Sequence, residues 1–145
     1  SWRKRGLVKV LIDTNILISA ALSNKGTPYK AFIKAVNFPF RGIICEQNVS
    51  ELRRIFSSKF PNRLFALETF LSTALLTLDY VAIPDIAYDI EQQLRDINDR
   101  PILRAAIYAD ADMILTGDKD FLESGIQRPR MISASDFINY DYISL

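Results

Sequence analysis

LVKVLIDTNILISAAL, residues 7–22, contains the change of pattern from which the architecture of this chain can be inferred. The run from Leu7 to Ile12 is apolar and rich in β-branched side chains, as in a buried strand, and it ends at Asp13. The following segment, LISAAL, is typical of a helix, so the sequence predicts a strand, a tight turn and a helix. An acid at the carboxyl end of such a strand projects into the crevice where open α/β sheets bind their ligands.

Strands and helices continue to alternate along the chain. Short apolar runs predict further strands at 42–45, 80–83, 113–115 and 130–132. Helical spacing predicts helices over 28–36 with Thr27 as N-cap, 49–56, 62–78, 102–109 and 136–142 with Ser135 as cap. Segment 85–98 fits a helix or a loop, and its state stays open. The alternation favours a three-layer α/β/α sandwich with a central, mainly parallel sheet, built as a single domain over residues 1–145.

Composition excludes several kinds of chemistry. The formal net charge is +1, from 18 basic and 17 acidic residues, so binding to nucleic acid would depend on a local patch. The chain contains no histidine, which removes Ser-His and Cys-His nucleophile pairs and imidazole-based zinc sites. A single cysteine, Cys45, excludes an internal disulfide and is expected to be a buried thiol. No apolar stretch approaches the ~20 residues of a membrane span, and we expect a cytoplasmic protein.

Four carboxylates lie beside apolar runs: Asp13, Glu51 in SELRRIF, Asp99 before PIL, and Asp118 in ILTGDKDF. Each alone has a structural explanation, as a helix cap, a solvated helix residue or part of a turn. If they converge, they repel one another by ~4 kcal/mol per pair at ~4 Å and an effective dielectric of ~20, so a bound cation or a raised pKa is expected. Oxygen ligands without histidine favour Mg²⁺ or Mn²⁺.

In order and spacing, these motifs resemble those of PIN-domain ribonucleases, and most closely the bacterial toxins of type II toxin–antitoxin pairs. The resemblance extends from Val8 to about Ile138 and rests on Asp13-Thr14-Asn15, the Glu51 motif, Asp99-x-Pro-Ile-Leu-x-Ala-Ala, and Thr116-Gly117-Asp118-Lys119-Asp120-Phe121. It implies a metal-dependent endoribonuclease with catalytic acids at Asp13, Glu51, Asp99 and Asp118. Asp13, Asp99 and Asp118 would bind the metal, and Asn15 and Thr116 would orient carboxylates. It also implies an RNA substrate, an antitoxin partner and a homodimer.

Several assignments stay open at this point. Asp120 could be a ligand or an outer-sphere acceptor, although the cap of the short helix in DFLES is the favoured role. Asp96 is a rival to Asp99, and Glu46 is a rival to Glu51. Candidate contacts to an RNA backbone are Arg53, Arg54, Arg100, Arg104 and Lys119, each of which could instead lie on a solvated helix face. Aromatic residues on apolar stripes are expected in the core, namely Phe32, Phe56, Phe65, Phe70 and Phe121.

Two other functions compete with the ribonuclease. A haloacid-dehalogenase-like phosphatase would also begin with a strand-end aspartate and carry a Gly-Asp pair. It needs a second aspartate two residues after the nucleophile, where this chain has Asn15, which has no acidic proton to donate. A catalytically silent PIN module would keep the acids and the metal, and would bind RNA or a protein partner without turnover.

Overall fold

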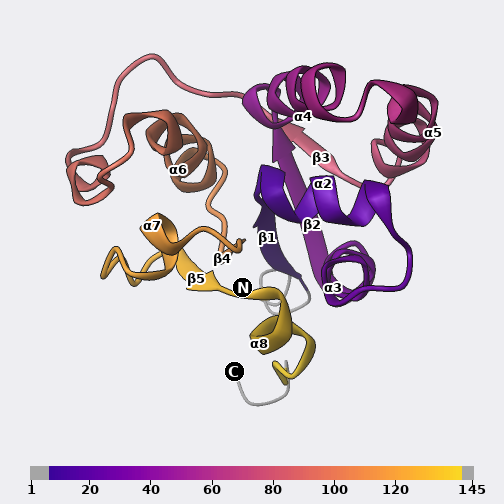
Figure 1. Ribbon diagram of the computed structural model, residues 1–145. Helices are drawn as coiled ribbons and strands as arrows, with labels where there is room; N and C mark the ends of the chain where they lie inside the picture. Colours follow the sequence, from indigo (N-terminus) through magenta and orange to yellow (C-terminus); the bar gives the residue numbers. More distant parts are fainter. Residues whose placement is uncertain (1–6, 142–145) are drawn as a thin grey trace.

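A five-stranded parallel sheet forms the centre of the protein in this computed structural model, which describes residues 7–141 (Figure 1). The strand order is β3-β2-β1-β4-β5, and each neighbouring pair is parallel. The strands are β1 (Val8–Ile12), β2 (Phe40–Cys45), β3 (Asp79–Val81), β4 (Met113–Leu115) and β5 (Arg130–Ile132). The predicted parallel α/β architecture is therefore confirmed.

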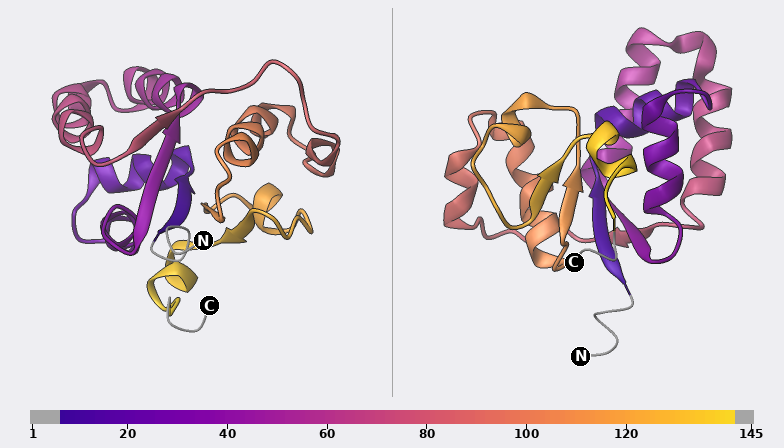
Figure 2. Two further views of the ribbon diagram at one scale, coloured as in Figure 1. Left: turned by 180° about the vertical axis from the view of Figure 1, so that it is seen from behind. Right: turned by 90° about the horizontal axis from the view of Figure 1, so that it is seen from below.

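Helices cover both faces of the sheet, which gives the predicted three layers (Figure 2). One face packs against α2 (Thr14–Leu22), α3 (Thr27–Ala35), α4 (Glu46–Lys59), α5 (Leu64–Ala74) and α8 (Ala134–Ile138). The other packs against α6 (Arg100–Tyr108) and α7 (Lys119–Leu122). Side chains of the central strand alternate between the two cores, with Val10 and Ile12 in one and Leu11 in the other. Burial on both faces explains why all residues of this strand except Lys9 are apolar.

The segment that the sequence left open contains short 3-10 helices. A long connection runs from β3 across the carboxyl edge of the sheet to α6 (Figure 1). It contains η2 (Asp89–Gln93) and η3 (Ile97–Asp99), while η1 (Pro61–Arg63) precedes α5. This connection delivers the third of the predicted acids to the carboxyl edge. Within residues 7–141, no helix has the length and apolar character needed to cross a bilayer.

Three predictions about helix ends are wrong. Gly26, with extended backbone, is the N-cap of α3, and Thr27 is already helical. Ser133 caps α8 by accepting a hydrogen bond from the backbone of Asp136, so Ser135 lies inside that helix, and the predicted end near Tyr142 lies outside the described residues. The helix predicted over 62–78 ends at Ala74, where a turn begins.

Phe65 corrects the predicted core. Its side chain is 86% exposed, because it lies on the outer side of α5 while Leu67 and Leu71 face the sheet. Phe56 and Phe121 are fully buried as expected. The apolar stripe of α5 thus runs through Leu67 and Leu71, and Phe65 lies outside it.

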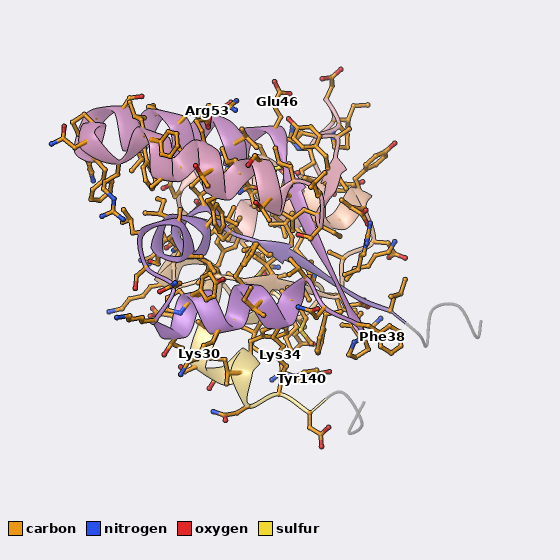
Figure 3. All side chains as sticks on the ribbon, turned by 90° about the vertical axis from the view of Figure 1, so that its right-hand side faces the viewer. Lys30, Lys34, Phe38, Glu46, Arg53 and Tyr140 are labelled. Carbon is orange, nitrogen blue, oxygen red and sulfur yellow. The ribbon has the colours of Figure 1, made fainter. Side chains whose placement is uncertain are left out.

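Lys34 of α3 fastens the last helix to the rest of the molecule (Figure 3). Its Nζ donates to the carbonyl oxygens of Phe137 at 2.6 Å, Ile138 at 3.1 Å and Tyr140 at 2.6 Å. It also lies over the rings of Phe40 and Phe137. The end of a helix leaves carbonyl groups without intrahelical partners, and a cation there is stabilising.

Replacement of Lys34 by Met is expected to lower the free energy of unfolding by about 2 kcal/mol, because three carbonyls lose a charged donor. Lys30 lies on the same helix but is exposed, so Lys30→Met is a matched control with an expected change below about 0.5 kcal/mol. Urea denaturation measures both variants. Equal stability of the two would contradict the role assigned to Lys34.

Candidate metal and active site

The predicted acids are carried by elements that meet at the carboxyl edge of the sheet. Asp13 directly follows β1, and Asp118 follows β4 by a short turn. Glu51 lies in α4, which begins immediately after β2, and Asp99 ends η3 where α6 begins. Strands β1 and β4 are neighbours, and the strand order reverses between them. This is the topological switch point at which open α/β sheets bind ligands.

Asp13 is buried and held by two hydrogen bonds. Its Oδ1 accepts from the backbone N–H of Thr14 at 2.8 Å, and its Oδ2 accepts from the Thr116 hydroxyl at 2.8 Å. The first bond makes Asp13 the N-cap of α2, so the same carboxylate both caps the helix and belongs to the candidate site. The pKa of Asp13 is raised to about 6: burial is the largest cause, the negative charges of Glu51 and Asp118 add to the rise, and the two hydrogen bonds oppose it.

Asp99 is even harder to ionise. Burial and the charges of Asp118, Asp13 and Asp96 raise the pKa of Asp99 to about 8. Its Oδ2 is buried without a hydrogen-bond partner among the described residues, and its side chain does not cap α6. The structure therefore brings Asp13, Asp99 and Asp118 within electrostatic reach of one another, and Glu51 acts on the same group through Asp13.

Asp96 and Asp120 belong to the same acidic group. Each of Asp96, Asp99 and Asp120 offers a carboxylate oxygen that lies within 4.8 Å of those of the other two. The role favoured for Asp120 is wrong, because Asp118 caps α7 by accepting a hydrogen bond from the Asp120 N–H at 2.9 Å. Asp118 has the extended backbone of a capping residue, whereas Asp120 is already helical. The carboxylate of Asp120 instead belongs to the acidic group and forms an ion pair with Arg95.

Glu51 lies closer to this arrangement than its rival Glu46. Glu46 is an exposed residue in the first turn of α4 (Figure 3). Glu51 is half-buried, and its Oε1 accepts a hydrogen bond from the Thr14 hydroxyl at 3.1 Å. Because Thr14 follows Asp13 directly, this bond ties the second acid to the first.

Thr14 and Asn48 form a buried network that sequence reasoning missed. The Nδ2 of Asn48 donates to the Thr14 hydroxyl at 3.0 Å, and its Oδ1 accepts from the backbone N–H of Cys45 at 2.9 Å. Asn48 is fully buried, as is the Cys45 thiol, which confirms the prediction for that cysteine. A signal was present, because Asn48 and Glu51 are three residues apart and share a helix face.

Thr116 and Asn15 hold the turn that carries the fourth acid. The Thr116 hydroxyl donates to Asp13 and accepts from the Asp118 N–H at 3.0 Å, so one buried side chain contacts both acidic positions. The Oδ1 of Asn15 accepts from the Gly117 N–H at 3.2 Å, so Asn15 contacts the turn that precedes Asp118. Both residues thus connect the carboxyl end of β1 to the turn that follows β4.

Thr116→Val is expected to raise the pKa of Asp13 by about one further unit, because the lost hydroxyl stabilises the ionised carboxylate. Thr116→Ser keeps the hydroxyl and should leave the pKa near that of the wild type. Titration of the Asp13 carboxyl carbon by NMR in metal-free protein measures the difference. A Val variant with an unchanged pKa would show that this bond does not support the charge of Asp13.

Two of the predicted RNA contacts are engaged elsewhere. Arg104 forms a paired contact with both carboxylate oxygens of Glu91, at 3.0 and 2.9 Å, and donates to the carbonyl of Pro84. Its side chain is only 17% exposed, so the prediction that Arg104 contacts phosphate needs correction. Arg100 donates to the carbonyl of Leu94 from Nε and Nη2. These bonds hold the β3–α6 connection against α6.

The remaining basic candidates lie on the surface. Arg53 forms an exposed ion pair with Glu68 on the neighbouring helix α5. Arg54 and Lys119 are exposed. Exposed cations of this kind contribute little to stability and lie where a polyanion can reach them.

Comparisons with known proteins agree with this geometry. The family described as PIN domain matches residues 9–120, which include all four predicted acids. The chain is 28% identical over 124 residues to "Uncharacterized protein MJ1680" of Methanocaldococcus jannaschii, across 79% of this chain and 74% of that protein. This family match leaves no support for the phosphatase alternative.

Solved structures share the fold at low sequence identity. VapBC2 from Rickettsia felis, solved bound to a DNA fragment from its promoter, has a TM-score of 0.63 at 19% identity, over 87% of this chain and 98% of that one. PAE2754 from Pyrobaculum aerophilum has a TM-score of 0.59 at 16% identity, over 92% and 96%. From its sequence match and its fold, the chain belongs to the PIN domain family.

Proposed function

We propose that this protein is a metal-dependent endoribonuclease that hydrolyses RNA phosphodiester bonds and serves as the toxin of a toxin–antitoxin pair. PIN domains are generally nucleases, and this chain carries an acid at each of the four motif positions. The single observation that carries the proposal is the gathering of Asp13, Asp99 and Asp118, with Glu51 beside them, at the switch point of the sheet.

The acidic group fits a divalent cation. All of its donors are carboxylate oxygens, which Mg²⁺ and Mn²⁺ prefer. Asp99 has a buried oxygen without a partner and a raised pKa, which is the electrostatic strain that a bound cation relieves. We assign Asp13, Asp99 and Asp118 as ligands, and Asp96 and Asp120 as further oxygen donors, because each offers a carboxylate oxygen within 4.8 Å of one of Asp99. When bound, the ion would make a water more acidic for attack on the phosphodiester and stabilise charge on the phosphate.

The residues around the acids prepare the site in advance. Thr14 and Thr116 fix both oxygens of Asp13, and Thr14 also fixes Oε1 of Glu51. Fixed carboxylates need no reorganisation during the reaction, which is a main source of catalytic power. In a chain without histidine, we assign Glu51 to accept a proton from the attacking water, because it is the one of the four acids that is not assigned as a metal ligand.

Exposed cations next to the acids would hold the RNA backbone. Arg53 and Arg54 lie on α4 with Glu51, and Lys119 follows Asp118 directly. Their role would be to position the strand, whereas target choice would depend on the shape of single-stranded RNA.

The test of the activity uses mixed RNA and the purified chain. Cleavage is expected with Mg²⁺ or Mn²⁺ and is expected to stop on addition of EDTA. Sequencing of the new RNA ends would identify the target in the same experiment. Tight Mn²⁺ binding without any cleavage would instead support a catalytically silent RNA- or partner-binding module.

The toxin role has a separate test. It rests on the motif resemblance and on the shared fold with VapBC2, and it implies an antitoxin that binds over the acidic site, as well as a homodimer. A small protein encoded beside this chain should copurify with it and suppress cleavage. If no such neighbouring gene exists, the toxin role fails while the nuclease proposal stands.

A further inference from the structure

Arg95 places a positive charge on the rim of the acidic group. Its Nη2 lies 2.8 Å from Oδ1 of Asp120, and Asp120 is one of the three acids whose oxygens lie within 4.8 Å of one another. The Arg95 side chain is 78% exposed, whereas that of Asp120 is 27% exposed. The guanidinium therefore reaches the acids from the solvent side and is not packed in the core.

The other arginine–carboxylate pairs of the described chain lie away from these acids. Arg41 pairs with Asp79 at the start of β3, Arg53 pairs with Glu68 of α5, and Arg104 pairs with Glu91 of η2. Arg95 thus supplies the arginine contact to this group within residues 7–141.

We propose that Arg95 is an internal counter-ion of the acidic site, which a divalent cation displaces from Asp120 and which then contacts a phosphate of the substrate. This inference rests on the proposed nuclease function. The cation and the guanidinium compete because Asp120, which the guanidinium contacts, has a carboxylate oxygen within 4.8 Å of one of Asp99, and two positive charges so close together repel each other. Displacement is feasible because an exposed ion pair contributes little free energy.

The surroundings of Arg95 suggest where its guanidinium goes. It borders a cavity of about 290 Å³ that is also lined by Gln93, Asp120, Glu123 and Ser124. The cavity shares Asp120 with the acidic group, so an RNA strand whose scissile phosphate is at the acids would pass it. A guanidinium binds phosphate with two parallel hydrogen bonds. Metal and RNA would then each increase the affinity of the other.

Binding of Mn²⁺ alone to the full chain tests whether the cation displaces Arg95 from Asp120. Arg95→Gln is expected to bind Mn²⁺ about tenfold more tightly than the wild type, measured from the free Mn²⁺ signal in electron paramagnetic resonance. Arg41→Gln removes a comparable exposed pair with Asp79 and should leave the affinity unchanged. A purely structural role of Arg95 would weaken Mn²⁺ binding on its removal, so unchanged or weaker binding in Arg95→Gln would overturn the proposal.

RNA cleavage at saturating Mn²⁺ tests whether the displaced Arg95 contacts a phosphate of the substrate. Arg95→Gln is expected to raise KM by about five- to tenfold with little change in kcat, because a contact used in binding is lost. Arg95→Lys, which keeps the charge, should have a KM between those of the wild type and Arg95→Gln. An unchanged KM would refute the phosphate contact. If the wild type cleaves no RNA while Arg95→Gln still binds Mn²⁺ more tightly, the nuclease proposal fails and the competition at Asp120 stands.

Discussion

Replacement of Asp13 by Asn is expected to slow metal-dependent RNA cleavage by about a thousandfold. Asn has the same shape and can still accept the hydrogen bond from the Thr14 N–H, so the fold should be retained. It removes the negative charge from the acid that Thr116 holds in place. Single-turnover cleavage at saturating Mn²⁺ measures the loss, and Asp118→Asn is expected to behave in the same way.

Asp136 provides the matched control. It is an exposed acid in the first turn of α8, on a helix that does not carry any of the site acids. Asp136→Asn should cleave within about twofold of the wild-type rate, in line with the small effects of surface substitutions. If Asp13→Asn and the wild type cleave equally, the activity belongs to a contaminant or the site is elsewhere.

Metal-free protein is expected to lose stability as the pH rises from about 4 to about 8. The pKa of Asp13 is raised from 3.8 to about 6 and that of Asp99 from 3.8 to about 8. Below the unfolded values both states hold these protons, and the stabilising contribution is complete. As the pH rises, the unfolded chain releases its protons first, so this contribution is lost up to the folded pKa values. Thermal unfolding in EDTA across this pH range measures the decline.

Asp99→Asn should remove most of that decline. Its expected effect is a gain of about 1–2 kcal/mol in the free energy of unfolding near pH 9 without metal, with the figure kept low because Asp99 is partly exposed and solvent screens its charge. Saturating Mn²⁺ should stabilise the wild type most at high pH, where the carboxylates are ionised. A variant with the same pH profile as the wild type would contradict the assigned repulsion.

The sequence predicted the architecture because its strongest signals are local. Apart from Lys9, the run ending at Asp13 and the strand before Thr116 are apolar on both faces, as is typical of strands buried between two helical layers. Their carboxyl ends define the crevice, so the acids that follow them could be placed at one edge of the sheet without coordinates. Glu51 follows from the same rule, since its helix begins where β2 ends.

What the sequence did not supply depends on contacts between distant segments. The bond from Asn48 to Thr14 and the pair between Arg95 and Asp120 join residues that no helical or strand period relates. Arg104 was misassigned because its partner Glu91 lies in a connection whose state the sequence left open.

Short-range ambiguity accounts for the other errors. Asp118 and Asp120 are two residues apart and both suit a helix start, so backbone conformation was needed to identify the cap. Phe65 precedes the buried Leu67 by two residues, which is about 200° around the helix, so it lies on the opposite face even though its apolar side chain suggested burial.

Anomalous diffraction from a crystal soaked in Mn²⁺ above about pH 8, where Asp99 is ionised, would locate the ion among the acids. A manganese peak is expected between the carboxylates of Asp13, Asp99 and Asp118, at the carboxyl ends of β1 and β4. A map without such a peak, or one in which these side chains turn apart toward solvent, would contradict the proposed metal site.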